Sequence, residues 1–257
     1  MASSDTEKTK ASQSGGVQSL ERAFDLLEHM ADAGREVPLS ELAKLSGLPM
    51  PTIYRLVRTM VNRGYVRQEQ SRQYALGPRL IRLGETASRL VGTWARPHLT
   101  RLVDEIGETA NMAMLDGDEI VYVAQIPSKH SMRMFTEVGR RVLPHSTAVG
   151  KVLLAQLPER QVTDLLRRTG MPAHTEHTIT TPAAFVEQLA AIREQGYAVD
   201  DGEQELGVRC IAVAVPNAPT MTAISISGPA ARVSESRYGE VVPALKGIAA
   251  ELSAALG

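Results

Sequence analysis

The spacing of apolar residues predicts a first helix that follows a polar tail. Residues 1–16 are rich in Ser, Thr, Lys, Gln and Gly and show no apolar period, so we expect them to be disordered. From Val17 onward, apolar residues recur on one side of a helix that ends near Gly34. They are Leu20, Ala23, Phe24, Leu27 and Met30.

The following segment predicts two more helices, a hairpin and a connecting helix. Ser40 is expected to cap a short helix, ELAKLS, that stops at Gly47. A second helix, PTIYRLVRTMVNR, has Pro51 in its first turn, where proline is favoured, and ends at Gly64. The run YVRQEQSRQYAL predicts two short strands around a polar turn, and PRLIRLGETASRLV predicts a connecting helix that contains Gly84.

After a change of composition at residues 93–97, strands and helices alternate. A helix is predicted at 97–106, and two strands within 111–126 meet at the turn Asp116-Gly117-Asp118. The remaining predicted strands are 131–138, 197–201, 208–215 and 221–228, and the remaining predicted helices lie within 145–155, 158–168, 182–195 and 234–255. Six strands with flanking helices predict an α+β domain.

Charge is unevenly distributed along the chain, although the net charge is only −1. Residues 1–91 carry a net charge of +3, and residues 92–257 carry −4. Within residues 51–82, seven arginines stand against a single acidic residue, Glu69. Such an excess is typical of a surface that contacts nucleic-acid phosphates. A solvated arginine face would have the same composition, so charge alone leaves both interpretations open.

Three features predict the compartment. No apolar run is long enough for a transmembrane helix, and the N-terminal residues lack the apolar core of a signal peptide. The single cysteine, Cys210, has no partner for an internal disulfide, which suits a reducing environment. We therefore expect a cytoplasmic protein with no membrane contact.

The segment LSELAKLSGLPMPTIYRLVRTM has the spacing of a helix-turn-helix. This motif needs a small residue where its helices cross and, four positions later, a turn residue that tolerates positive φ. Ala43 and Gly47 occupy these positions. The apolar residues that would lock the second helix onto the first are Leu42, Leu48, Ile53 and Leu56. The alternative, a three-helix packing module without DNA contact, leaves the outward arginines unexplained.

The second helix of this motif would lie in the DNA major groove and contact bases near its N-terminus. The residues expected nearest the bases are Met50, Pro51, Thr52 and Tyr54. Arg55 and Arg58 can reach either a phosphate or a guanine, and only a base contact would specify sequence. Arg67 and Arg72 are expected on a hairpin wing along the DNA backbone. Ser40, at the start of the first helix of the motif, completes the candidate DNA contacts.

The segment HSTAVGKVLLA, residues 145–155, allows three interpretations. A phosphate-binding P-loop is excluded, because residue 152 is Val and no glycine stands five positions before Gly150. A nucleophilic site would need His145, oriented by an acid, beside Ser146 or Cys210, and the sequence does not support that geometry. The third interpretation is anion binding, since the first turn of a helix offers free backbone N–H groups and a partial positive charge.

In the anion-binding interpretation, Ser146 or Thr147 caps the helix, and Ala148, Val149 and Gly150 are small enough for close approach of a carboxylate. Polar residues of neighbouring predicted strands would hold the rest of the ligand, with the two serines on the same face of one strand. They are Asp200, Cys210, Ser225 and Ser227. Taken singly, each feature is more typical of an ordinary capped helix or of a half-buried strand serine than of a binding site.

Six segments, in this order, make the chain similar to the IclR family of bacterial transcriptional regulators over residues 17–257. They are VQSLERAFDLLEHMA, LSELAKLSGLPMPTIYRLVRTM, YALGPRLIRLG, LPHSTAVGKVLLA, GYAVDDGEQELGVRCIAVAV and AISISGP. The resemblance implies a winged helix-turn-helix DNA-binding domain at 17–77, a linker helix at 78–92 and an effector-binding domain at 93–257 related to GAF and PAS folds. It also implies dimers through the DNA-binding domains and tetramers through the effector domains.

Within the family, GETANMAMLDGDEIVYVAQI, KHSMRMFTEVG and SISGP are most similar to the allantoin- and glyoxylate-responsive repressor branch. This resemblance implies a small organic acid as effector, such as glyoxylate or allantoate. The residues that it implies around the effector are Ala148, Val149, Asp200, Cys210, Ser225 and Ser227. Ala148-Val149 stands where that branch has Gly-Ala, and the added side chains shrink the pocket.

We therefore expect a homodimeric or homotetrameric repressor of catabolic genes that needs no cofactor and binds a pseudo-palindromic operator in double-stranded DNA. A small carboxylate effector is expected to release it. The linker helix is the expected transmitter, with Gly84 as a candidate bend. The alternatives are an activator with the same fold and a Cys or Ser hydrolase fused to a DNA-binding module.

Overall fold

The computed structural model describes residues 17–91, 93–134 and 136–256. Their contacts divide the chain into two compact units between Thr86 and Ala87. Helix α4, Arg79–Val91, crosses this division and corresponds to the predicted connecting helix. The predicted disordered tail, residues 1–16, lies outside the described residues.

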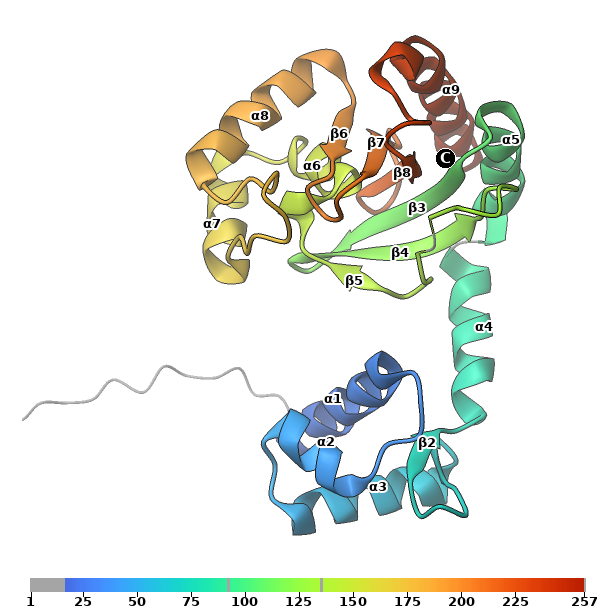
Figure 1. Ribbon diagram of the computed structural model, residues 1–257, viewed down its shortest axis with the longest axis vertical. Coiled ribbons are helices and arrows are strands. Elements are labelled where there is room, and N and C mark those ends of the chain that lie inside the picture. Colours follow the sequence, from blue (N-terminus) through green and yellow to red (C-terminus); the bar gives the residue numbers. More distant parts are fainter. Residues whose placement is uncertain (1–16, 92, 135, 257) are drawn as a thin grey trace, which may run out of the picture. The chain divides into compact units, whose positions relative to one another are not determined.

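The first unit contains three helices and a two-stranded hairpin (Figure 1). Its elements are α1 (Gln18–Ala33), α2 (Leu39–Ser46), α3 (Met50–Arg63), β1 (Val66–Gln68) and β2 (Tyr74–Leu76). Leu42 and Ile53 are fully buried and lock α3 onto α2, as predicted. Gly47 ends α2 with a φ of 65°, a conformation that glycine adopts without strain. The helix-turn-helix expected from the sequence is therefore present.

The predicted capping role of Ser40 is wrong. Helix α2 already begins at Leu39, and its N-cap is Pro38, whose extended backbone (φ −76°, ψ 153°) suits that position. The Pro38 carbonyl accepts hydrogen bonds from the backbone N–H of Glu41 at 3.0 Å and of Leu42 at 3.3 Å. Ser40 consequently lies inside the first turn, exposed to solvent.

The buried side of α1 also differs from the predicted apolar stripe. Leu26 and Met30 enter the core, whereas Leu20 and Phe24 are 54% and 57% exposed. Only part of the apolar surface of α1 is therefore buried against α2 and α3. A second apolar strip on α1 remains exposed to solvent.

The second unit is built on a six-stranded antiparallel sheet in the order β5-β4-β3-β8-β7-β6. Its strands are β3 (Thr109–Asp116), β4 (Glu119–Ile126), β5 (Arg141–Val142), β6 (Ala198–Asp201), β7 (Val208–Ala214) and β8 (Thr222–Pro229). Its helices are α5 (Arg96–Ile106), α6 (Ala148–Leu154), α7 (Glu159–Thr169), α8 (Pro182–Gln195) and α9 (Tyr238–Leu256). Short 3-10 turns lie at η1 (Thr93–Ala95), η2 (Pro144–Ser146) and η3 (Glu235–Arg237).

The two faces of this sheet form separate cores. Ile211 and Ile224 are buried against α5 and α9, whereas their neighbours Ala212 and Ala223 are buried against α6, α7 and α8 (Figure 1). This alternation follows from the strand geometry, in which successive side chains point to opposite faces. The unit is therefore α+β, as predicted.

The predicted strand at residues 131–138 is wrong, although the total of six strands holds for the described residues of the second unit. The third strand of this region is the short β5, which pairs with Ile120 and Val121. The described residues of 131–138 are bends, coil and, at Val138, the start of a turn. The carbonyl of Met134 accepts a hydrogen bond from Thr109 Oγ1 at 3.0 Å, and that of Met132 accepts one from Arg232 at 2.9 Å. Side chains of other elements thus take the bonds that a strand partner would have made.

A β-bulge in β4 decides where Tyr122 points. Met112 pairs with Ala124, but its neighbour Ala113 pairs with Tyr122, so Val123 is the extra residue of the bulge. Ala124 lies in the core with α5 and α9, while Tyr122 packs on the opposite side with α6. Bulges redirect side chains in this way, and here the tyrosine is brought to the α6 face.

A helix that crosses a bilayer must be both long and apolar, and this requirement applies to the described helices. None of them could cross a membrane.

Candidate functional site

Helix α3 presents a polar, arginine-bearing side to solvent. Ile53, Val57 and Met60 anchor it in the core. The opposite side carries the residues predicted to approach DNA: Met50, Pro51, Tyr54, Arg55 and Arg58 are exposed, and Thr52 is half-buried. Among the described residues, the guanidinium groups of Arg55 and Arg58 make no hydrogen bond or ion pair, so their charges are available to a ligand.

The two arginines of the hairpin are placed differently from each other. Arg67 on β1 is exposed and pairs with Glu69 at 2.7 Å, which partly neutralises it. Arg72 lies at the hairpin turn, where its φ of 62° is left-handed and its N–H donates to the Glu69 carbonyl at 2.9 Å. Its side chain is exposed.

A side-chain cap and a glycine fix the backbone conformation at the start of helix α6. Thr147 is the N-cap, and its Oγ1 accepts a hydrogen bond from the backbone N–H of Gly150 at 3.2 Å. Of the two predicted candidates, Ser146 and Thr147, the cap is therefore Thr147. Gly150 is required for packing, because a Cβ there would lie 2.2 Å from the Pro144 carbonyl oxygen. The backbone N–H groups of Ala148 and Val149 belong to the unpaired first turn.

A cavity of about 140 Å³ lies at this helix start. It brings together all six residues proposed from the sequence, namely Ala148, Val149, Asp200, Cys210, Ser225 and Ser227. Sequence reasoning missed the other polar or flexible residues that line it, namely Tyr122, Met134, Thr136, Arg140, Gln204 and Glu205. The first four come from the bulged strand β4 and the irregular segment after it. Both features depend on pairing between distant parts of the chain, so no local sequence pattern marks them.

The two serines share a buried amide. Asn111 Nδ2 donates to Ser227 Oγ at 3.1 Å and to Ser225 Oγ at 3.4 Å, and Asn111 Oδ1 accepts from Gln125 Nε2 at 3.2 Å. Each serine hydroxyl thus accepts a hydrogen bond from Asn111 and can still donate one of its own, and both serines line the cavity.

Asp200 has an unusual protonation state for an aspartate. Burial, as the largest cause, and the nearby Glu203 carboxylate together raise its pKa to about 7. Backbone N–H groups of Glu203 (2.8 Å) and Gln204 (3.3 Å) donate to Asp200 Oδ1 and, with the Lys151 ammonium, act in the opposite direction. Asp200 can therefore be a neutral hydrogen-bond donor near pH 7.

The cavity is not arranged for nucleophilic chemistry. Burial raises the pKa of the Cys210 thiol well above its usual range, so the thiol stays protonated. His145 Nε2 lies 3.0 Å from the Pro172 carbonyl, and burial lowers the pKa of the imidazole. Ser146 Oγ donates to Gln204 Oε1 at 2.7 Å rather than to His145. No nucleophile among these three is activated by a base.

Comparison with protein families assigns both units. The family model described as "IclR helix-turn-helix domain" matches residues 19–70, and "Bacterial transcriptional regulator IclR C-terminal" matches residues 86–254. Transcriptional repressor IclR of Escherichia coli (strain K12) is 39% identical over 96% of this chain and 93% of its own length. HTH-type transcriptional repressor AllR of the same strain is 31% identical over 94% of this chain and 91% of its own. Relatives from several branches thus match, and the allantoin branch is one of them.

Solved structures agree with this assignment. The structure of an IclR transcriptional regulator from Alicyclobacillus acidocaldarius is 30% identical, with a TM-score of 0.83 over 94% of this chain and all of that one. An IclR homologue from Microbacterium hydrocarbonoxydans, complexed with 4-hydroxybenzoate, shares the fold at 23% identity, with a TM-score of 0.79 over 93% of this chain and 98% of that one. The regulators that match are DNA-binding proteins and not enzymes. On this evidence, the chain belongs to the IclR family of bacterial transcriptional regulators.

Proposed function

We propose that this regulator is a repressor of catabolic genes, and that a small carboxylate in the cavity at α6 releases it from DNA. The observation that carries the proposal is the cavity itself, which combines a helix N-terminus with protonated or hydroxyl-bearing side chains. The helix start provides backbone donors for a carboxylate. Asp200, Ser225 and Ser227 provide hydrogen bonds to a neighbouring carbonyl or hydroxyl oxygen. A 2-oxo or 2-hydroxy acid has both groups.

The cavity volume limits the size of the effector. A cavity of about 150 Å³ in another protein accommodates benzene, which has roughly six non-hydrogen atoms. The present cavity, of about 140 Å³, is of the same order. It therefore favours an acid of the size of glyoxylate over allantoate, which carries two ureido groups. The side chains of Ala148 and Val149 act in the same direction.

Arg140 supports the preference for an anion. Its side chain is exposed and lines the cavity, and among the described residues it makes no ion pair. Its neighbour Arg141 is instead paired with Asp116 at 2.9 Å and Glu119 at 2.7 Å. We assign the free guanidinium of Arg140 to attraction of the acid at the entrance.

Release requires that the acid bind one domain arrangement more tightly than the other, because only differential affinity shifts a population. Helix α4, which runs between the two units, is the proposed transmitter. For DNA we propose that α3 enters the major groove and that Arg55 or Arg58 contacts a base. The protein would act as a homodimer or homotetramer on a pseudo-palindromic operator, because operator symmetry mirrors protein symmetry.

The proposal is tested by binding of the full-length protein to fragments of its source genome at moderate ionic strength. We expect fluorescence anisotropy to show a preference for particular fragments over random duplex, and release by glyoxylate or another small carboxylate. In reporter cells, loss of the protein should raise expression from those fragments, whereas loss of an activator would lower it. No preference for any fragment, with or without acids, contradicts the proposal.

Three variants test the two proposed sites. Arg55→Ala is expected to weaken operator binding by about 1–3 kcal/mol if Arg55 contacts a base. Arg160→Ala, which removes an exposed arginine of α7, should leave binding unchanged. Asp200→Ala should bind the operator normally but resist release by the acid. Release at an unchanged acid concentration would exclude the assigned pocket.

A further inference from the structure

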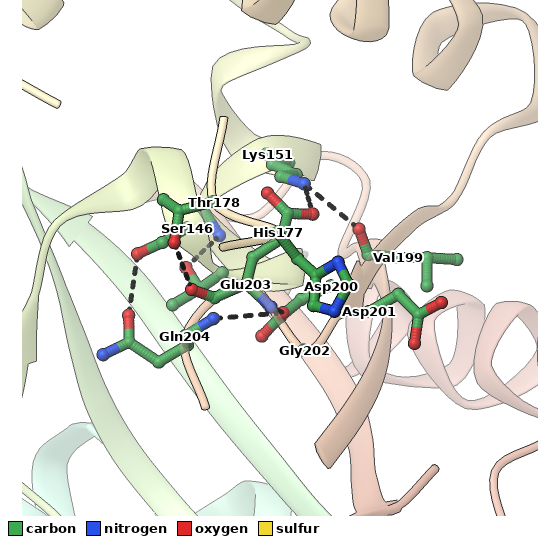
Figure 2. A network of polar contacts seen from close by, with 12 residues as sticks. Ser146, Lys151, His177, Thr178, Val199, Asp200, Asp201, Gly202, Glu203 and Gln204 are labelled. Atoms are coloured by element: carbon green, nitrogen blue, oxygen red, sulfur yellow. Dashed lines mark hydrogen bonds and ion pairs between the residues drawn. The ribbon is translucent and has the colours of Figure 1, made fainter. Parts of the chain in front are cut away.

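A buried lysine and a buried glutamate lie directly behind the proposed effector cavity. Lys151, on α6, is fully buried, and Glu203, in the loop after β6, is 6% exposed. The Lys151 ammonium pairs with Glu203 Oε1 and also donates to the Val199 carbonyl at 3.3 Å (Figure 2). No pattern in the sequence predicts a role for either residue.

This pair contributes little to stability by itself. Both charges lose their hydration on burial, and replacing such a pair by apolar residues is often neutral or stabilising. The second oxygen of the Glu203 carboxylate is buried and has no hydrogen-bond partner among the described residues. Most buried polar atoms in proteins have a hydrogen-bond partner, so this oxygen is an exception. Its connections to neighbouring residues therefore matter more than its own energy.

Those connections lead to Asp200. Glu203 holds Lys151 through its side chain, and its backbone N–H donates to Asp200 Oδ1 at 2.8 Å. The carbonyl of Glu203 accepts from Thr178 Oγ1 at 2.6 Å, and Gln204 Oε1 accepts from Ser146 Oγ at 2.7 Å (Figure 2). Residues 200–204, which form the end of β6 and the loop that follows it, are thus attached to η2, to α6 and to the segment before α8.

The two groups that bind the acid in the proposed function come from different elements. The backbone donors belong to α6, and the Asp200 carboxyl belongs to β6. Lys151 lies one turn after the start of α6, and Glu203 lies in the loop that binds Asp200 Oδ1. Among the described residues, the Lys151–Glu203 pair is the side-chain ion pair that joins them.

We propose that Lys151 and Glu203 are positioning residues that hold the Asp200 carboxyl at a set distance from the start of α6. The proposal rests on the effector pocket of the proposed function. It goes beyond that function by assigning the specificity of the pocket to a buried pair that does not touch the ligand. Without the pair, α6 and the loop at 200–204 can separate, and the two ends of a small acid are no longer held together.

The first experiment replaces both members with apolar residues, Lys151→Met and Glu203→Met in one protein. We expect a melting temperature close to that of the wild type. We also expect faster exchange of the backbone amide hydrogens at position 203 and at Gln204, and at least tenfold weaker binding of the probe glyoxylate. The control removes an exposed ion pair between a turn and a helix, Asp118→Ala with Arg168→Ala, and should change none of the three.

The second experiment is the isosteric variant Glu203→Gln, measured by carbon-13 NMR titration of the Asp200 carboxyl. The groups that face Asp200 are Lys151 of α6, Glu203 of its own loop, Cys210 of β7 and Tyr122 of β4. Removing the Glu203 charge while Lys151 stays charged should lower the pKa of Asp200. An unchanged pKa would show that the Glu203 carboxylate does not act on Asp200, whereas amide exchange in the double variant reports whether the pair positions the loop.

The outcomes separate the inference from the proposed function. Unchanged amide exchange in the double variant, together with an unchanged Asp200 titration in Glu203→Gln, overturns the inference. If both change as expected while the wild type binds neither glyoxylate nor any other small carboxylate, the positioning role stands and the proposed function fails.

Discussion

At the scale of single residues, Asp200 combines two opposing influences. Burial favours its neutral form, and the backbone N–H groups of Glu203 and Gln204 favour its charged form. The balance places its pKa at about 7. A carboxyl with this pKa donates a hydrogen bond to an acid below pH 7 and repels the acid above it.

The first prediction concerns the pH dependence of effector binding. Affinity for glyoxylate, measured by titration calorimetry, should be highest below pH 7 and fall by about tenfold per pH unit above the pKa of Asp200, because binding retains its proton. Asp200→Asn, which stays neutral, should bind with little pH dependence. A wild-type affinity that is constant from pH 6 to 8.5 would show that Asp200 does not face the acid.

The titration of Asp200 should also affect the free energy of unfolding, which extends the first prediction to stability. The unfolded chain releases the Asp200 proton near pH 4, whereas the folded protein keeps it until about pH 7. The folded state therefore loses stability as pH rises through this window, and the loss is complete above pH 7. Melting temperatures at pH 5 and 8 should fall more for the wild type than for Asp200→Asn. An equal fall in the two proteins would contradict the raised pKa.

At the scale of elements, the start of α6 depends on a close approach between backbones. Gly150 faces the Pro144 carbonyl of η2 with no room for a side chain. Gly84, inside α4, is in open space, because a Cβ there would meet no atom within 4 Å. The same substitution should therefore have opposite effects in the two helices.

The second prediction is this pair of glycine substitutions. Gly150→Ala should destabilise the protein by about 1–3 kcal/mol, as other overpacked cores do, and should abolish acid binding by shifting the helix start. Gly84→Ala should stabilise α4 by about 0.5–1 kcal/mol. Denaturant unfolding measures both. If Gly84 is a bend that transmits the signal, its alanine variant should also resist release from the operator by the acid, whereas normal release would rule that role out.

At the scale of the whole molecule, the proposed pseudo-palindromic operator would be bound by two copies of the first unit, because operator symmetry mirrors protein symmetry. Helix α1 carries an exposed apolar strip at helical spacing, formed by Val17 (65% exposed), Leu20 (54%) and Phe24 (57%). Apolar side chains clustered in this way are typical of a protein interface. We expect this strip to contact a second copy of the chain, as the family resemblance implies.

The third prediction tests that contact. Leu20→Glu combined with Phe24→Glu should shift the protein to a lower oligomeric state in light scattering and weaken operator binding at least tenfold. The helix itself should persist, because neither residue lies in the core. Met132→Glu, at an apolar position that is 71% exposed in the second unit, is the control. An unchanged oligomeric state in the α1 variant would locate the interface elsewhere.

Local patterns in the sequence determined much of this protein. The helix-turn-helix followed from the period of apolar residues and from Gly47, because both act within a few residues. The side-by-side placement of Ser225 and Ser227 followed from strand alternation. The anion-binding interpretation placed Asp200 and Cys210 near the start of α6, and motif similarity pointed to the same residues.

Only the tertiary structure decided the rest. Ser40 lost its capping role to Pro38. The described residues of 131–138 formed no strand, and side chains from distant elements bind the carbonyls of Met132 and Met134. Tyr122 and Arg140 reached the cavity through a bulge and an irregular segment. The burial that raises the pKa of Asp200, and the pairing of Lys151 with Glu203, exist only once α6 packs on the sheet. Local periodicity specifies which segments form and which way they face, whereas desolvation and long-range pairing depend on the packed whole.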